Sequence, residues 1–182
     1  MDYTKFRYYK GESECPFPHD GFSDEDLCSC VYVYPRAYWW WAERMVLAHF
    51  RERFGSIERA IECWIWKGEL SGEWSLVISY VTGDKPSQDG GKFRYYKGET
   101  TCPFECDINI PREDWLVKYP KAYWWWAERE SAQLAQKHKN VEYAIIDWIK
   151  RNWQISPKEG YPRYNQITLA ASYVNGNAPL IA

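Results

Sequence analysis

The stretch Ala37–Arg44 reads AYWWWAER, and Ala122–Arg129 repeats it letter for letter. A Tyr-Pro pair precedes each copy. Three further pairs of similar segments occur in the same order in both halves of the chain. They are KFRYYKGE at Lys5–Glu12 and Lys92–Glu99, IERAIECWI at Ile57–Ile65 with VEYAIIDWI at Val141–Ile149, and SYV at Ser79–Val81 and Ser172–Val174. Because the order is kept and only the spacing changes, the chain is a tandem duplication of one unit.

The duplication sets the expected domain organisation. We expect a first repeat unit at residues 1–83, a linker at residues 84–91 and a second repeat unit at residues 92–182. The linker sequence, DKPSQDGG, is rich in Gly, Pro and polar residues, which is typical of a connecting segment. Each unit would be small on its own, so we expect the two units to share one hydrophobic core or to pack together.

The amino-acid composition limits the kinds of partner that this protein is expected to bind. The chain has 182 residues, of which 19% are aromatic, and its 23 basic and 25 acidic side chains give a net charge of −2. This balance makes duplex nucleic acid an unlikely partner, since that binding depends on neutralising phosphates. Neither a signal-peptide pattern nor a long apolar run is present, so we expect a cytoplasmic protein with free thiols and no membrane contact.

The local patterns predict an α+β fold. We expect each unit to run strand, loop, helix, helix, strand, with the two units sharing or packing a mostly antiparallel sheet covered by helices. The expected strands are Lys5–Lys10, Lys92–Lys97, Trp74–Val81 and Ile167–Val174.

Helix signals are clearer than strand signals. Pro35 and Pro120 suit the first turn of helices that we expect to reach about Phe54 and His138. The segments at Ile57–Ile65 and Val141–Ile149 have the apolar spacing of an amphipathic helix. We also expect Ser56 and Asn140 to cap these helices, and a short helical turn after Pro111.

The aromatic blocks are the first candidate binding surface. Successive helical residues turn by about 100°, so three adjacent tryptophans cannot all face one layer. They are either wedged between layers or exposed at an interface, and we expect a non-catalytic module that presents them to a protein, a peptide or a second copy of itself as a homodimer. The candidate residues are Tyr38, Trp39, Trp40, Trp41, Tyr123, Trp124, Trp125 and Trp126.

Glu43 and Glu128 are the polar candidates beside these blocks. A carboxylate at the edge of an aromatic face needs a partner, and Arg7 and Arg94, the lysines after them, or Tyr hydroxyls could supply it. A structural interaction is one reading. The alternative is an enzyme that uses the two carboxylates as acid and base in a cleft between the units.

Two further readings carry less support. Cys15, His19, Cys28 and Cys30 have zinc-type donors, but their spacing is not a standard one and the second unit lacks the His. We therefore expect no metal and no cofactor. Single-stranded nucleic acid could stack on the aromatic rings, although no positive groove is evident from the sequence.

Overall fold

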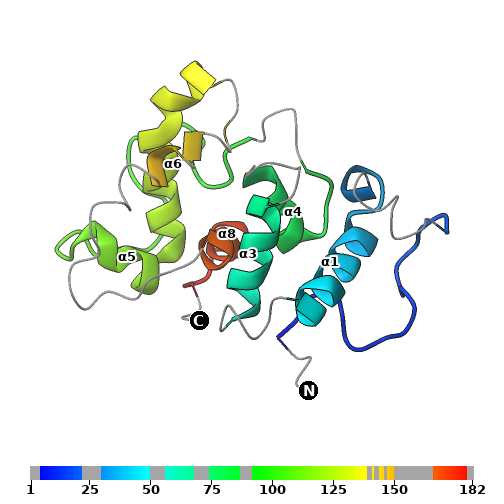
Figure 1. Cartoon of the computed structure of the whole chain (residues 1–182). Coiled ribbons are helices and arrows are strands. Elements are labelled where there is room, and N and C mark those ends of the chain that lie inside the picture. The colour runs from blue at the N-terminus through cyan, green and yellow to red at the C-terminus, as the bar shows by residue number, and fades with distance from the viewer. Residues whose placement is uncertain are drawn as a thin grey trace. The chain divides into compact units, whose positions relative to one another are not determined.

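A computed structural model describes residues 5–21, 30–49, 56–67, 74–86, 92–138, 141, 144–145, 147–149 and 166–179. The chain divides into two compact units, Met1–Pro86 and Ser87–Ala182. The first unit contains helices α1 (Pro35–His49), α3 (Ile57–Lys67) and α4 (Trp74–Thr82), and the second contains α5 (Arg112–Lys118), α6 (Pro120–His138) and α8 (Gln166–Asn175) (Figure 1).

The expected α+β fold is wrong for the part of the chain that the structure describes, which is helical and contains no strand or sheet. Lys5–Lys10 and Lys92–Lys97 are irregular loops of bends and turns. Trp74–Val81 lies within α4, and Ile167–Val174 lies within α8.

The two apolar runs are helices that are enclosed on most sides. A short apolar run with β-branched residues fits a buried strand and a buried helix equally well. Every residue from Trp74 to Tyr80 is buried, so no alternation of exposed and buried positions separates the two possibilities. Gly83 and Gly176 follow the helices with φ of 76° and 69°, the left-handed conformation that ends many helices.

Several helix predictions are confirmed. Helix α1 begins at Pro35 and α6 begins at Pro120, and α6 ends at His138. The Ser56 hydroxyl accepts a hydrogen bond from the Arg59 amide at 3.3 Å, which is an N-cap for α3. Helix α5 supplies the expected turn after Pro111. The expected end near Phe54, the Asn140 cap and part of Val141–Ile149 lie outside the described residues.

The aromatic helix is the centre of each unit. In the first unit α1 packs against α3 and α4, and in the second α6 packs against α5 and α8. Trp39 and Trp124 are completely enclosed at 0% exposure. Among the described residues, no helix has both the length and the apolar character needed to cross a membrane.

Candidate functional site

Glu43 organises the loop that the sequence predicted to be a strand. Its carboxylate accepts hydrogen bonds from the amides of Arg7, Tyr8 and Tyr9 at 2.9, 2.8 and 2.7 Å. A fourth bond comes from the Tyr80 hydroxyl at 2.8 Å. Successive main-chain N–H groups form an anion-binding concavity, and here the chain's own carboxylate occupies it. The amides are therefore satisfied without a neighbouring strand.

The second unit repeats this arrangement around Glu128. Its carboxylate accepts from the amides of Arg94, Tyr95 and Tyr96 at 2.7, 2.8 and 2.7 Å, and from the Tyr173 hydroxyl at 2.8 Å. The expected Tyr hydroxyl partner is thus present in both units. The bonds from Arg7 and Arg94 come from their main-chain amides.

The environment of Glu43 and Glu128 does not favour acid–base chemistry. Both side chains have 0% exposure, and each already accepts four hydrogen bonds. Burial raises the pKa of Glu43, while its amide and hydroxyl donors oppose that rise. Burial and the nearby Glu43 charge raise the pKa of Tyr80, which keeps its hydroxyl a donor. Such a saturated, enclosed carboxylate serves to hold the loop.

The tryptophan blocks lie in the interior. Trp39, Trp40 and Trp41 have exposed fractions of 0%, 5% and 9%, Trp124 and Trp125 of 0% and 2%, and Trp126 is half-buried. Tyr38 and Tyr123 are also buried. These rings therefore do not form an open surface for stacking or docking.

Several tryptophan indole N–H groups form hydrogen bonds inside each unit. Trp39 Nε1 donates to Ser79 Oγ at 3.0 Å, and Trp124 Nε1 donates to Ser172 Oγ at 2.9 Å. Trp40 Nε1 donates to Glu12 at 3.3 Å. Trp41 and Trp64 meet edge to face at 5.4 Å, one of several such aromatic pairs. The indoles thus tie the aromatic helix to the neighbouring helices and loop.

Exposed cations lie where the loop meets the end of the last helix. The Arg7 guanidinium lies 5.6 Å from the centre of the Tyr80 ring, and the Arg94 guanidinium lies 5.5 Å from that of Tyr173. Both arginine side chains are exposed. We call the group of Arg7, which lies over Tyr80, and Arg36, which lies near the Tyr8 hydroxyl, the first cationic face.

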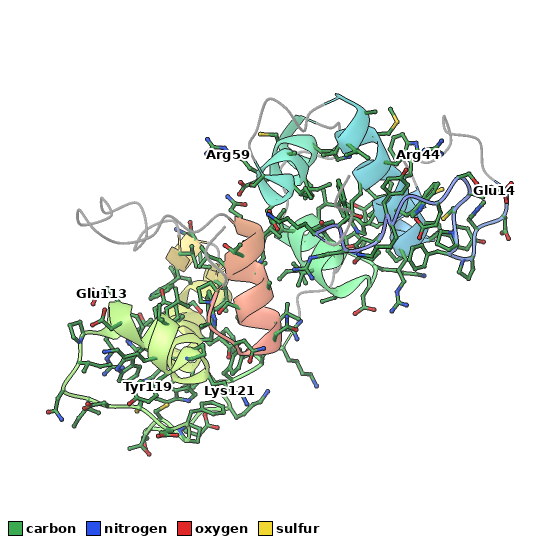
Figure 2. All side chains as sticks on the ribbon, turned by 90° about the horizontal axis from the view of Figure 1, so that it is seen from below. Glu14, Arg44, Arg59, Glu113, Tyr119 and Lys121 are labelled. Carbon is green, nitrogen blue, oxygen red and sulfur yellow. The ribbon has the colours of Figure 1, made fainter. Side chains whose placement is uncertain are left out.

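The second cation of each face packs on a glycine. A Cβ atom built on Gly83 would lie 3.1 Å from Arg36 Nε, and one built on Gly176 would lie 3.1 Å from Lys121 Cε. Figure 2 shows Lys121 at the N-terminal end of α6, near the end of α8. Arg94, which lies over Tyr173, and Lys121, which lies near the Tyr95 hydroxyl, form the second cationic face, which is the counterpart of the first.

The first cationic face borders an open surface depression of about 310 Å³, which we call the cavity. Its lining residues come from the loop, from the start of α1 and from the end of α4: Arg7, Tyr8, Phe17, Arg36, Val81 and Thr82. Within the described part of the chain, neither arginine forms an ion pair. The Tyr8 hydroxyl is already bound to the Tyr80 carbonyl, so the guanidinium groups are the polar groups that remain open to a ligand.

The suggested zinc donors do not assemble in the part of the chain that is described. No cluster of three or more His, Cys, Asp or Glu side chains suited to a metal ion is found there. Cys15 Sγ donates to the Phe17 carbonyl, and His19 Nδ1 accepts from the Gly21 amide at 3.3 Å. Cys28 lies outside the described residues.

Sequence reasoning missed the cationic faces and named only one cation of each, Arg7 and Arg94. Arg36 and Lys121 are separated from them by a long stretch of chain, and only the fold brings them together. One signal was available. Both units carry a cation directly after the Tyr-Pro pair, outside the identical AYWWWAER block. Comparison of the chain with protein-family models, with curated protein sequences and with solved structures found no match.

Proposed function

We propose that this protein is a non-catalytic binding module whose two repeat units each present a cationic face to a partner protein or peptide that carries acidic groups. This keeps the class of function expected from the sequence and moves the binding surface. The tryptophans build the units, and the exposed cations beside them meet the partner.

The observation that carries the proposal is the repetition of an exposed arrangement. In each unit an arginine lies over the tyrosine that holds the buried glutamate, and a second cation lies over a helix-ending glycine. Arg36 and Lys121 differ in residue type, yet both are cations in the same place. Exposed side chains contribute little to folding, so a repeated cationic pair supports a role in recognition.

The rest of each unit supports presentation of the face. Arg7 and Arg94 project from loops whose amides are bound by Glu43 and Glu128, so the loop main chain is fixed before any partner arrives. A fixed loop loses less conformational entropy on binding than a mobile one. Two such faces on one chain increase avidity toward a partner that reaches both.

A peptide array tests the proposal. The full chain is applied to peptides of matched length that are acidic, neutral or basic, alongside an Arg7→Ala/Arg94→Ala variant. We expect binding to acidic peptides that falls by about tenfold in the variant, because charge-assisted hydrogen bonds contribute about 1.5–3 kcal/mol.

Arg44→Ala/Arg129→Ala is the matched control. Arg44 and Arg129 are exposed and lie 5.5 and 5.6 Å from the rings of Trp40 and Trp125, so this variant removes the same charge and the same type of ring contact elsewhere. Equal binding to neutral and acidic peptides, or equal loss in both variants, contradicts the proposal.

Sedimentation of the chain alone tests whether it forms a homodimer, in which case a second copy would be the partner. The free thiols of the described cysteines suit the reducing cytoplasm, where we place this binding.

A further inference from the structure

We infer that the cavity between Arg7 and Arg36 is a binding site for a single oxyanion, a carboxylate or a phosphate, and that the two units differ in how they hold it. The inference rests on the proposed function, because it names the chemical group that the first cationic face recognises. Four observations on this face support it.

The first observation is the pairing of two guanidinium groups at one cavity. Arg7 and Arg36 are two exposed arginines at one opening, and neither forms an ion pair among the described residues. Like charges repel, so they give the opening a positive potential, which the nearby Asp84 carboxylate reduces in part. Each guanidinium presents donors in a planar fork that matches a carboxylate or a phosphate. The opening of about 310 Å³ is larger than the anion, so the group can enter with the stem that carries it.

The second observation is that Arg36 is placed by packing. Its side chain crosses the surface of Gly83, where an added Cβ would lie 3.1 Å from Nε and 3.3 Å from Cγ. The Tyr8 hydroxyl also lies 3.3 Å from that point. The bare main chain at Gly83 therefore lets the guanidinium lie close to the loop, so Arg36 and Arg7 border the same opening.

The third observation is that the other polar groups of the cavity are engaged. Thr82 Oγ1 donates to the Ile78 carbonyl at 2.9 Å and accepts from the Asp84 amide at 3.2 Å. The Tyr8 hydroxyl donates to the Tyr80 carbonyl. Among the side-chain donors of the described lining residues, the guanidinium groups are left for a ligand, which favours an anion over a neutral polar group.

The fourth observation is a difference between the units. Ser79 Oγ donates to the Asp84 carbonyl at 2.6 Å, and Ser172 Oγ donates to the Asn177 carbonyl at 2.6 Å, so these two positions are equivalent. The first face combines two arginines with an acidic neighbour, whereas the second combines Arg94 and Lys121 with a neutral Asn177. The Asp84 charge, which acts on the neighbouring Tyr8, opposes anion binding at the first site, and Lys121 acts as a point charge at the second.

Titration of the isotope-labelled full chain with inorganic phosphate and with acetate tests the inference. The readout is the NMR signals of the arginine Nε–H groups and of the amides near Tyr8 and Gly83, with sodium chloride at equal ionic strength as the reference. We expect saturable shifts with at least one oxyanion and none with chloride. Saturation by phosphate alone assigns a phosphate group, and saturation by acetate assigns a carboxylate.

The two units supply their own variants for this test. Arg36→Ala should weaken binding at the first face by about tenfold, and Arg36→Lys, which copies the second unit, by about threefold. Asp84→Asn, which also copies the second unit, should strengthen binding at the first face severalfold. Arg44→Ala should leave the shifts unchanged.

Several results would overturn the inference. They are shifts that do not saturate, shifts that persist unchanged in Arg36→Ala and Arg36→Lys, or an Asp84→Asn variant that binds less tightly. Arg36→Lys and Asp84→Asn are small exposed changes, so the test does not depend on the folding of Arg36→Ala. The small anions also separate this inference from the proposed function. Binding of phosphate or acetate without selection of acidic peptides would retain the site and reject the function.

Discussion

Tyr80 donates its hydroxyl to the buried carboxylate of Glu43 across 2.8 Å, and the same carboxylate gathers three successive amides of the loop at Arg7–Tyr9. One acidic residue of α1 thus joins an irregular loop to the end of α4. Tyr173 and Glu128 repeat the relationship in the second unit. Loss of this carboxylate should therefore affect both the loop and the helix.

Glu43→Gln should destabilise the protein by about 2–4 kcal/mol. The amide nitrogen of Gln cannot accept a hydrogen bond, so at least one buried main-chain N–H loses its partner, and the charge that strengthened the other bonds is lost. Chemical denaturation measures the change. Glu14→Gln, at an exposed position (Figure 2), should change stability by less than about 0.5 kcal/mol. A Glu43→Gln variant as stable as Glu14→Gln would show that the carboxylate is dispensable.

Ser79→Ala should cost about 1–3 kcal/mol, because Ser79 Oγ accepts from Trp39 Nε1 and donates to the Asp84 carbonyl. Removing it leaves the buried indole N–H unpaired. Ser172→Ala should cost a similar amount through Trp124. Thermal unfolding measures both, with the exposed Ser13→Ala as reference. If only one of the two buried variants is destabilised, the hydrogen bonds of the two units are not equivalent in energy.

Gly83→Ala should be more harmful than Gly21→Ala. Both glycines have positive φ, +76° and +65°, so each substitution carries the cost of a left-handed residue, about 1–2 kcal/mol. A Cβ on Gly21 meets no atom within 4 Å, whereas one on Gly83 meets the Arg36 side chain at 3.1 Å. Denaturation should show the common cost in both variants. The NMR signal of Arg36 should shift in Gly83→Ala alone, and a shift in both would mean that backbone strain moves it.

Alkaline pH should unfold the protein between about pH 10 and pH 12. Burial raises the pKa of Tyr95 from 10.0 to about 12, and it also raises the pKa of Tyr8, Tyr123 and Tyr173. A phenol whose pKa is higher in the folded state than in the unfolded state contributes stability that is complete below the unfolded pKa. That stability is lost as the pH rises through the folded pKa.

Tyrosinate absorbance and circular dichroism follow this transition together. We expect the buried phenols to ionise only as the helical signal falls. Ionisation of all fifteen tyrosines near pH 10 with no loss of helix would contradict the assignment.

The helices around the aromatic blocks were predictable because their signals are local. A proline in the first turn, a serine cap and an apolar stripe each act within one or two turns, so they can be recognised without knowing the fold. The segment Ile57–Ile65 has the apolar stripe and the preceding serine cap, and it lies within α3. The special position of Glu43 was also visible, because a charge within an aromatic block requires a partner.

The strand predictions failed for a physical reason. The KFRYYK segments have the aromatic composition of a strand, but a carboxylate can satisfy a main-chain amide as well as a neighbouring strand can. Whether the amide binds a carboxylate or a strand depends on a residue more than thirty positions away in the sequence. The sequence left open whether the block tryptophans are wedged between layers or exposed, since periodicity cannot say whether Trp40 faces a neighbouring layer or solvent.

By itself the sequence determined the duplication, the aromatic helices and the presence of an acidic residue that had to be paired, because repeats, caps and buried charges are properties of short segments. Only the tertiary structure decided that Glu43 and Glu128 bind loops, that Trp74–Thr82 and Gln166–Asn175 are helices, and that Arg36 lies beside Arg7 at one cavity. Those outcomes depend on contacts between distant parts of the chain, whose formation no local pattern encodes.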